Sequence, residues 1–178
     1  EGISQAIGVG GRDMIHAVGG LMTHEALDAL GADPATELLV VIGKPPAPHV
    51  RRQVEDTLKA LGKPAVVAML GREVKPALDG KIQVVATLED AARATLAALR
   101  GERWTARAFS GDSAATRRRI LEARKTLEPG QRAVHGLFAG GTLAYEAVLL
   151  LESLLGPVSG TTSVASALNL VSEQGVTL

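Results

Sequence analysis

The stretch Glu37-Leu38-Leu39-Val40-Val41-Ile42-Gly43 decides the expected fold, because five aliphatic residues follow one another after a turn signal. An uninterrupted aliphatic run is typical of a strand that is covered on both faces, as in a parallel sheet. Two further aliphatic runs, Ala65–Leu70 and Ile82–Ala86, predict two more strands. A buried strand is also predicted for Gln5–Val9, which leads into a group of glycines.

Segments with the apolar spacing of a helix alternate with these strands. The spacing predicts helices over Leu21–Leu30 and Pro48–Leu61, with the proline at an early helix position. A third helix is predicted to run to Leu99 from Thr87-Leu88-Glu89-Asp90, which approximates a capping box. This alternation predicts an α/β fold, with a parallel sheet, right-handed crossovers and helices on both faces.

The chain is expected to hold one domain and the start of a second. Residues 1–100 form the first domain, residues 101–130 a connector, and residues 131–178 the start of a second, similar domain. In the last segment, Ala133–Phe138 predicts a strand and Thr142–Leu155 a helix, while the Ser-, Thr- and Gly-rich end stops without closing a fold. Because the chain opens without an initiator Met, it is interpreted as a fragment or as the ordered part of something longer.

Composition narrows the class of partner. The 19 basic and 19 acidic side chains balance, which argues against a nucleic acid or an anionic membrane as the main partner. Aromatic residues make up 2% of the chain, fewer than a protein that stacks single-stranded bases normally needs. The Arg- and Lys-rich helix predicted after Asp112 also carries glutamate, so it is interpreted as a solvated face.

The absence of cysteine bears on chemistry and location. It excludes disulfides, thiolate catalysis and cysteine-based metal sites, and it fits a cytoplasmic protein. No apolar run is as long as a membrane span, and no signal peptide is visible. A cytoplasmic location without a membrane partner is therefore expected.

Two glycine-rich turns, Ala6–Asp13 and Phe138–Ala147, are candidate anion sites. A glycine turn from a strand into a helix directs unpaired N–H groups and the positive end of the helix dipole at one spot. Such a spot suits a phosphate, a carboxylate or an oxyanion. The alternative is that these turns only change the direction of the chain. The candidate anion-binding residues are Gly10, Gly11, Arg12, Asp13, Lys44, Gly140, Gly141 and Thr142.

Three of these candidates depend on the carboxyl edge of the predicted sheet. Arg12 and Asp13 follow the first glycine turn, where they would enter a ligand crevice or form a local ion pair. Lys44 follows the strand that ends at Ile42, where it would contact an anion or simply be exposed beside the prolines. Both interpretations remain open for each residue, and no catalytic residue is identified.

The four histidines do not predict a metal site. His16, His24, His49 and His135 include no pair at the i, i+4 spacing of a zinc site, and no cysteine is present to assist. His24 is interpreted as a surface residue and His49 as a residue near a helix start. His135 lies inside an apolar strand and is interpreted as a satisfied core or strand-end histidine.

The order of the motifs resembles the FdrA family of the succinyl-CoA synthetase (NDP-forming acyl-CoA ligase) superfamily. The resemblance lies in Gly2–Asp13, in the turn Asp33-Pro34-Ala35-Thr36 and in Ile42–Pro46, and Lys63–Val67 fits the third strand of that superfamily. It resumes at Gly136–Ala147, within which Gly140–Ala147 is similar to the ligase turn Ser-Gly-Thr-Leu-Thr-Tyr-Glu-Ala. The resemblance implies two flavodoxin-like ligase domains in series, the first without its opening strand and glycine turn.

The sequence departs from the ligases where their chemistry takes place. The ligases carry phosphate on a histidine in a Gly-His-Ala-Gly loop, but residues 70–80 contain no histidine. Lys44 stands where the ligases place the glutamate that holds that histidine. The resemblance therefore implies binding of an acyl- or carbamoyl-phosphate-like group without a phosphohistidine relay, for which a lysine is suited.

Two functions follow as expectations. The first is an enzyme subunit for acid–thiol ligation or for carbamoyl transfer involving oxamate, as the resemblance implies. The second is a non-catalytic scaffold or regulatory subunit of a multi-subunit enzyme. The expected partners are a small anionic substrate and other subunits or a second copy of the chain. No cofactor is expected within this chain, and the candidates for the full-length protein are CoA or a phosphorylated substrate.

Overall fold

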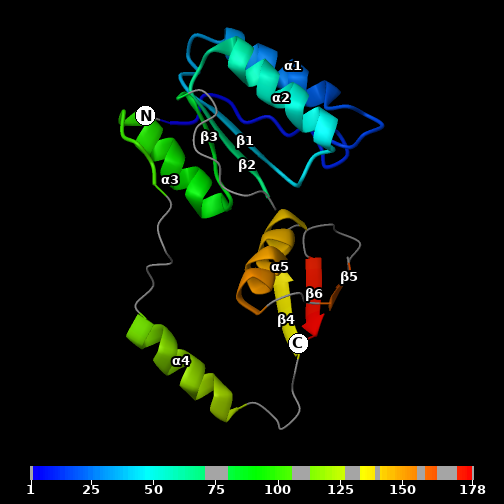
Figure 1. Ribbon diagram of the computed structural model, residues 1–178, viewed down its shortest axis with the longest axis vertical. Coiled ribbons are helices and arrows are strands. Elements are labelled where there is room, and N and C mark those ends of the chain that lie inside the picture. Colours follow the sequence, from blue (N-terminus) through cyan, green and yellow to red (C-terminus); the bar gives the residue numbers. More distant parts are fainter. Residues whose placement is uncertain are drawn as a thin grey trace. The chain divides into compact units, whose positions relative to one another are not determined.

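The computed structural model describes residues 2–70, 80–105, 113–126, 133–138, 141–155, 159–163 and 172–177. The chain divides into two compact units, Glu1–Trp104 and Thr105–Leu178, which are called unit 1 and unit 2 below (Figure 1).

Unit 1 is built on a parallel sheet with the strand order β1-β2-β3. The strands are β1 (Leu39–Gly43), β2 (Ala65–Met69) and β3 (Ile82–Val84). In the parallel register, Leu39 lies opposite Ala65, which in turn lies opposite Ile82. The aliphatic runs thus form strands as predicted, and the α/β fold is confirmed. The expected cover of β1 on both faces is wrong, because β1 lies at the edge of the sheet and its Val40 and Ile42 are 43% and 54% exposed.

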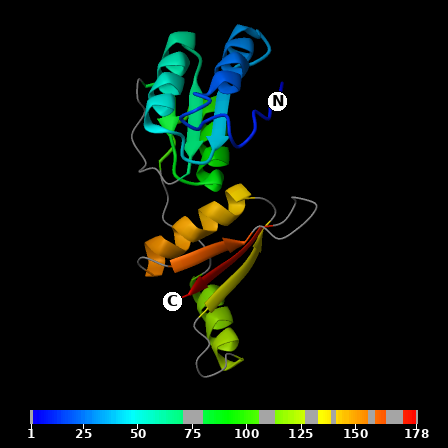
Figure 2. The ribbon, with the colours of Figure 1, turned by 90° about the vertical axis from the view of Figure 1, so that its right-hand side faces the viewer.

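Helices cover both faces of this sheet. Helices α1 (Leu21–Ala32) and α2 (Pro48–Leu61) pack on one face, and α3 (Leu88–Leu99) packs on the other (Figure 2). The larger core lies under α1 and α2 and contains Leu27, Leu39, Val50, Val54, Leu58, Ala65, Val67, Met69, Ile82 and Val84. All five residues of β2 are buried, because this central strand is covered on both sides.

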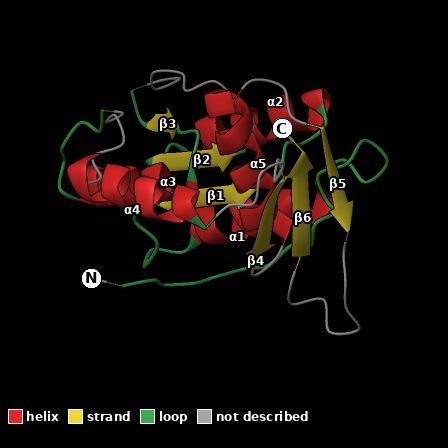
Figure 3. Ribbon diagram, turned by 90° about the horizontal axis from the view of Figure 1, so that it is seen from below, coloured by secondary structure: helices red, strands yellow, loops and turns green. Residues whose placement is uncertain are grey.

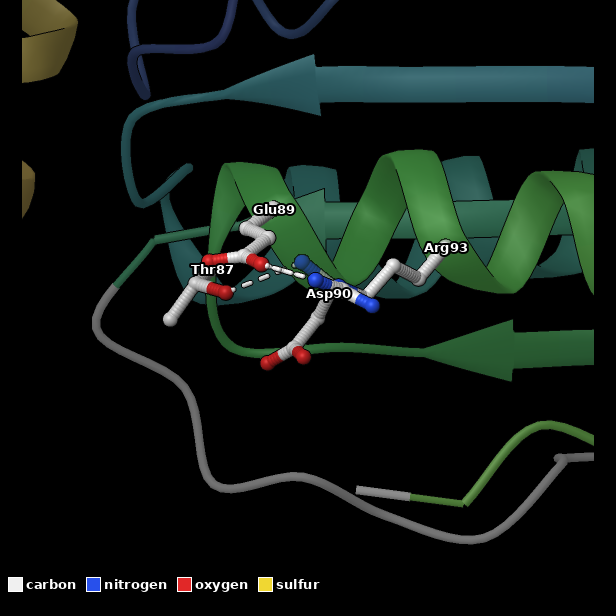
Figure 4. Close-up of polar contacts among 4 residues, drawn as sticks. All are labelled: Thr87, Glu89, Asp90 and Arg93. Atoms are coloured by element: carbon white, nitrogen blue, oxygen red, sulfur yellow. Dashed lines mark hydrogen bonds and ion pairs between the residues drawn. The ribbon is translucent and has the colours of Figure 1, made fainter. Parts of the chain in front are cut away.

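Helix α3 begins at the predicted cap. The Thr87 hydroxyl accepts a hydrogen bond of 3.0 Å from the backbone N–H of Asp90, as Figure 4 shows. Glu89 and Asp90 lie in the first turn, where negative charge interacts favourably with the helix dipole. Glu89 and Arg93 form an ion pair of 2.6 Å, but both side chains are exposed, so the pair contributes little to stability. The cap therefore sets where this helix starts.

The predicted strand over Gln5–Val9 is wrong. This segment has no regular secondary structure and its side chains are largely exposed, with Ile7 at 49%. A hydrogen bond of 2.8 Å between the hydroxyls of Ser4 and Thr36 links it to the turn before β1. Apolar residues alone do not make a strand, because the backbone also needs a neighbouring strand to pair with, and glycines weaken the preference for one.

Unit 2 contains α4 (Ser113–Lys125), which is followed by the predicted strand and helix, β4 (Ala133–Phe138) and α5 (Gly141–Leu155). Its sheet has the order β4-β6-β5 and is antiparallel (Figure 3). The remaining strands are β5 (Ser159–Ser163) and β6 (Ser172–Thr177).

The end of unit 2 differs from the expectation, because β5 and β6 complete a three-stranded sheet with β4. The sequence was expected to stop here without closing a fold. Thr and Val favour strands even in a Ser- and Gly-rich context, and the antiparallel partner lies too far along the chain for local patterning to predict.

The basic helix α4 fits a solvated face. Arg118 and Arg119 are exposed, and Lys125 forms an exposed ion pair of 2.9 Å with Glu122. Among the helices in the described ranges, none combines the length and the apolar character that crossing a bilayer requires.

Candidate functional site

The carboxyl edge of the unit 1 sheet carries two of the predicted site residues, Lys44 directly after β1 and Asp13 at the N-terminus of α1. It is defined here as the edge where β1, β2 and β3 end, together with the loops that follow them. Helices α2 and α3 begin after β1 and β3, and α1 ends just before β1 begins, so the N-termini of all three helices lie at this edge. In open α/β sheets, ligands bind outside the carboxyl ends of the strands.

Asp13 occupies the N-terminus of α1. Its carboxylate accepts hydrogen bonds of 2.9 Å from the backbone N–H groups of Met22 and Thr23, and another from the Thr23 hydroxyl. Asp13 is only 4% exposed, and this burial acts to raise its pKa. The hydrogen bonds from Thr23 and Met22 and the charge of His24 outweigh it and hold the pKa below its ordinary value of 3.8. The carboxylate therefore remains charged inside the fold.

This placement corrects the interpretation of the first glycine turn. Asp13 neither lines a ligand crevice nor pairs with Arg12, because it binds the helix amides that an external anion would bind. Gly10, Gly11 and Arg12 form an exposed turn before it, and the Asp13 N–H donates to the Gly10 carbonyl at 3.3 Å. The turn and the helix start lie apart in the sequence, so the turn itself does not present the N-terminus of α1.

Gly20, which is not among the predicted site residues, directly precedes α1 and sets the path of the chain into this helix. It adopts a left-handed conformation, with φ of 79°, directly before Leu21. Its N–H donates to the Asp13 carbonyl at 2.9 Å. Hence Asp13 fixes this entry through both its side chain and its backbone. The Gly19-Gly20 pair was the signal in the sequence that marked this helix start.

The N-terminus of α2 is different from those of α1 and α3. Its N-cap residue is Ala47, which offers no side-chain cap, and the first helical residue is Pro48, which has no N–H. Lys44 is exposed and follows β1 directly. Among the described helices of unit 1, the first N–H groups of α1 donate to the Asp13 carboxylate, and an N–H of the first turn of α3 donates to the Thr87 hydroxyl. The N-cap residue of α2 makes no such bond, and the preceding loop carries Lys44.

The candidates Gly141 and Thr142 belong to unit 2. They form the first residues of α5 and both are half-buried. A helix therefore starts where the second glycine turn predicted one. Gly140 lies outside the described residues.

The turn Asp33–Thr36, part of the family resemblance, has a structural role. The Asp33 carboxylate accepts hydrogen bonds from the Ala35 N–H (2.9 Å) and the Thr36 hydroxyl (2.8 Å), and these lower the pKa of Asp33. Lys63 donates to the carbonyls of Leu30 (3.1 Å) and Asp33 (2.7 Å) at the end of α1. These residues fix the path from α1 into β1.

The fold brings together two histidines that spacing alone did not connect. The Nδ1 atoms of His16 and His49, 33 residues apart in sequence, lie 3.3 Å apart. His24 instead shares a hydrogen bond of 2.9 Å with the Thr57 hydroxyl. Within the described ranges, no group of three or more His, Cys, Asp or Glu residues gathers as a metal site would.

These features define an α/β domain with an open parallel sheet. No family model matches the chain. The chain is similar to the uncharacterized protein YahF of Escherichia coli (strain K12), with 35% identity over 159 residues. The match covers 88% of this chain but 30% of the relative, so the chain spans less than a third of the length of that protein.

Proposed function

We propose that this chain is part of an FdrA-like member of the acyl-CoA synthetase superfamily. It binds an acyl- or carbamoyl-phosphate-like group at the carboxyl edge, for acyl or carbamoyl transfer without a phosphohistidine relay. The observation that supports it best is the start of α2, where a helix without a side-chain cap follows the exposed Lys44. The proposal includes a cytoplasmic location, a small anionic substrate and other subunits as partners.

The chemistry of such a group matches the groups at this edge. A nucleophile attacks the acyl or carbamoyl carbon, the bond from that carbon to the phosphate oxygen breaks, and phosphate leaves with the bonding electrons. Negative charge therefore grows on the phosphate. A lysine ammonium and helix N–H groups held in place beforehand stabilise that charge more than they stabilise the neutral parts of the substrate.

A non-catalytic scaffold or regulatory subunit is the alternative function. One observation favours it: Asp13 fills the N-terminus of α1, so one candidate anion position is already taken by the protein itself. Under this alternative, the fold would persist while partner proteins carry out the chemistry.

One assay separates the two functions. The full-length protein is incubated with carbamoyl phosphate and with CoA, separately, and product formation is compared between wild type and Lys44→Gln. Lys59→Gln is the matched control, because Lys59 is another exposed lysine but lies in the last turn of α2. The enzyme proposal expects turnover that Lys44→Gln lowers and Lys59→Gln leaves unchanged. No turnover with either substrate would favour the scaffold.

No phosphohistidine is expected anywhere in this chain. Residues 71–79 contain no histidine and Lys44 replaces the supporting acid of the ligases. The full-length protein is incubated with ATP or an acyl phosphate, and acid-labile phosphate is mapped by mass spectrometry. Phosphate on any histidine of the chain would contradict this prediction, because another histidine would then carry the phosphate.

The second glycine turn carries its own prediction. Gly141→Val is expected to abolish anion binding at the start of α5 while leaving most of the fold intact, because a branched side chain blocks close approach to the backbone. When a backbone N–H no longer donates to the charge that develops in the transition state, the loss commonly costs roughly 3 kcal/mol of transition-state stabilisation. Binding and turnover are measured alongside circular dichroism. Full activity in the Gly141→Val variant would show that the turn has only a structural role.

A further inference from the structure

The two segments that carry His16 and His49 are held together by the backbone. Met14 accepts a hydrogen bond of 3.0 Å from the N–H of Ala47, two residues before His49. The loop around His16 is closed by a bond of 2.9 Å from the Gly19 N–H to the Ile15 carbonyl. The imidazoles therefore meet because the fold places their segments side by side.

We propose that His16 and His49 together hold a divalent transition-metal ion of the zinc type. Their Nδ1 atoms are 3.3 Å apart and the rings meet edge to face, with centroids 4.6 Å apart. Two nitrogens each about 2.05 Å from one zinc ion and 3.3 Å apart subtend an angle of about 107° at the ion, close to the tetrahedral value. The two nitrogens share a hydrogen bond in the structure, and an ion that replaces this bond would reach both nitrogens at ordinary bond lengths.

The chemistry of the pair selects the class of ion. Imidazole nitrogen suits Zn²⁺, Ni²⁺ and Cu²⁺, whereas Mg²⁺ and Ca²⁺ prefer oxygen ligands. His16 is exposed and His49 partly so, which leaves a path for the ion. Two protein ligands leave the remaining positions to water or to the oxygen of an anion, which the positive end of α2 also attracts. The site stands independently of the anion-binding function proposed above.

Zinc titration of the tag-free chain in a phosphate-free buffer tests the site, with calorimetry as the readout. The variants are His16→Gln, His49→Gln and the double substitution. His24→Gln is the matched control, because its ring lies in the same unit but bonds to Thr57. Because His16 is exposed, its substitution leaves the fold intact, which circular dichroism verifies.

A shared ion makes the two substitutions non-additive. We expect one zinc per chain, a loss of affinity on the order of 10²-fold in either single variant, and little further loss in the double variant. His24→Gln should bind as the wild type does. Equal affinity in wild type and double variant, or losses that simply add, would overturn the proposal, since each ring would then bind metal alone or not at all.

Nuclear magnetic resonance gives a second readout that does not depend on affinity. On adding zinc, the ring nitrogen signals of His16 and His49 should shift together, with the same midpoint, while those of His24 remain in place. A shift confined to one ring would contradict a shared ion.

Discussion

Replacing Asp13 by alanine is expected to destabilise unit 1 by about 3 kcal/mol, because the substitution removes an ionised acceptor from a buried site. The N–H groups of Met22 and Thr23, together with the Thr23 hydroxyl, would lose their partner. Urea unfolding followed by the fluorescence of Trp104, the single tryptophan, reports on this unit because Trp104 packs against its smaller core.

Asp28→Ala is the matched control, since Asp28 lies on the same helix and is exposed. Its effect should stay within about 0.5 kcal/mol. If Asp13→Ala were as mild as this control, the carboxylate would not fix the entry into α1.

The contribution of Asp13 should also depend on pH. Its pKa is lower in the folded chain than the ordinary value of 3.8, so the unfolded state binds the proton more tightly. The charged carboxylate therefore makes its full contribution to the free energy of unfolding above pH 3.8. This contribution decreases as the pH falls toward and through the lowered pKa. The stability difference between wild type and Asp13→Ala should shrink over this acidic range. A difference that grew on acidification would have the wrong sign.

Gly20→Ala is expected to cost about 3 kcal/mol, through two separate effects. A non-glycine residue in the left-handed region costs about 1–2 kcal/mol. In addition, a Cβ at this position would lie 2.8 Å from Cγ1 of the buried Val50, which must shift within a packed core.

Gly19→Ala separates these effects. Gly19 has nearly the same conformation, with φ of 76° against 79° for Gly20, but a Cβ there meets no atom within 4 Å. It should therefore cost about 1 kcal/mol, the conformational part alone. Equal losses in the two variants would show that the contact with Val50 is unimportant.

Local patterns predicted the parts of unit 1 that depend on local physics. The aliphatic runs predicted β1, β2 and β3, but of these three strands only β2 is buried along its whole length, as a doubly covered strand is. In β1, Val40 and Ile42 are exposed, so its apolar run predicted the strand and not its cover. The start of α3 followed from Thr87, whose hydroxyl bonds to an N–H three residues away. The strand predicted for Gln5–Val9 was wrong, because the hydrophobicity of a segment does not show whether another strand lies alongside it.

The site depends on contacts that are distant in the sequence. Asp13 binds amides nine and ten residues away, and His16 meets His49 across 33 residues, so neither contact follows from spacing rules. Lys44 could be placed from the sequence, because residues that follow a parallel strand lie at the carboxyl edge. The parallel sheet of unit 1 is therefore predictable from the sequence. Whether a side chain of the protein already binds the N–H groups at a helix N-terminus is not.

The most direct test of the proposed anion site is a titration of the ¹⁵N-labelled chain with freshly dissolved carbamoyl phosphate, with the backbone N–H signals as the readout. We expect saturable shifts at His49 and Val50, the first N–H groups of α2, and a marked loss of affinity in Lys44→Gln but not in Lys59→Gln. Inorganic sulfate, added separately, shows whether any dianion suffices. Signals of α2 that stay unmoved, or shifts that persist equally in Lys44→Gln, would contradict an anion site at the carboxyl edge.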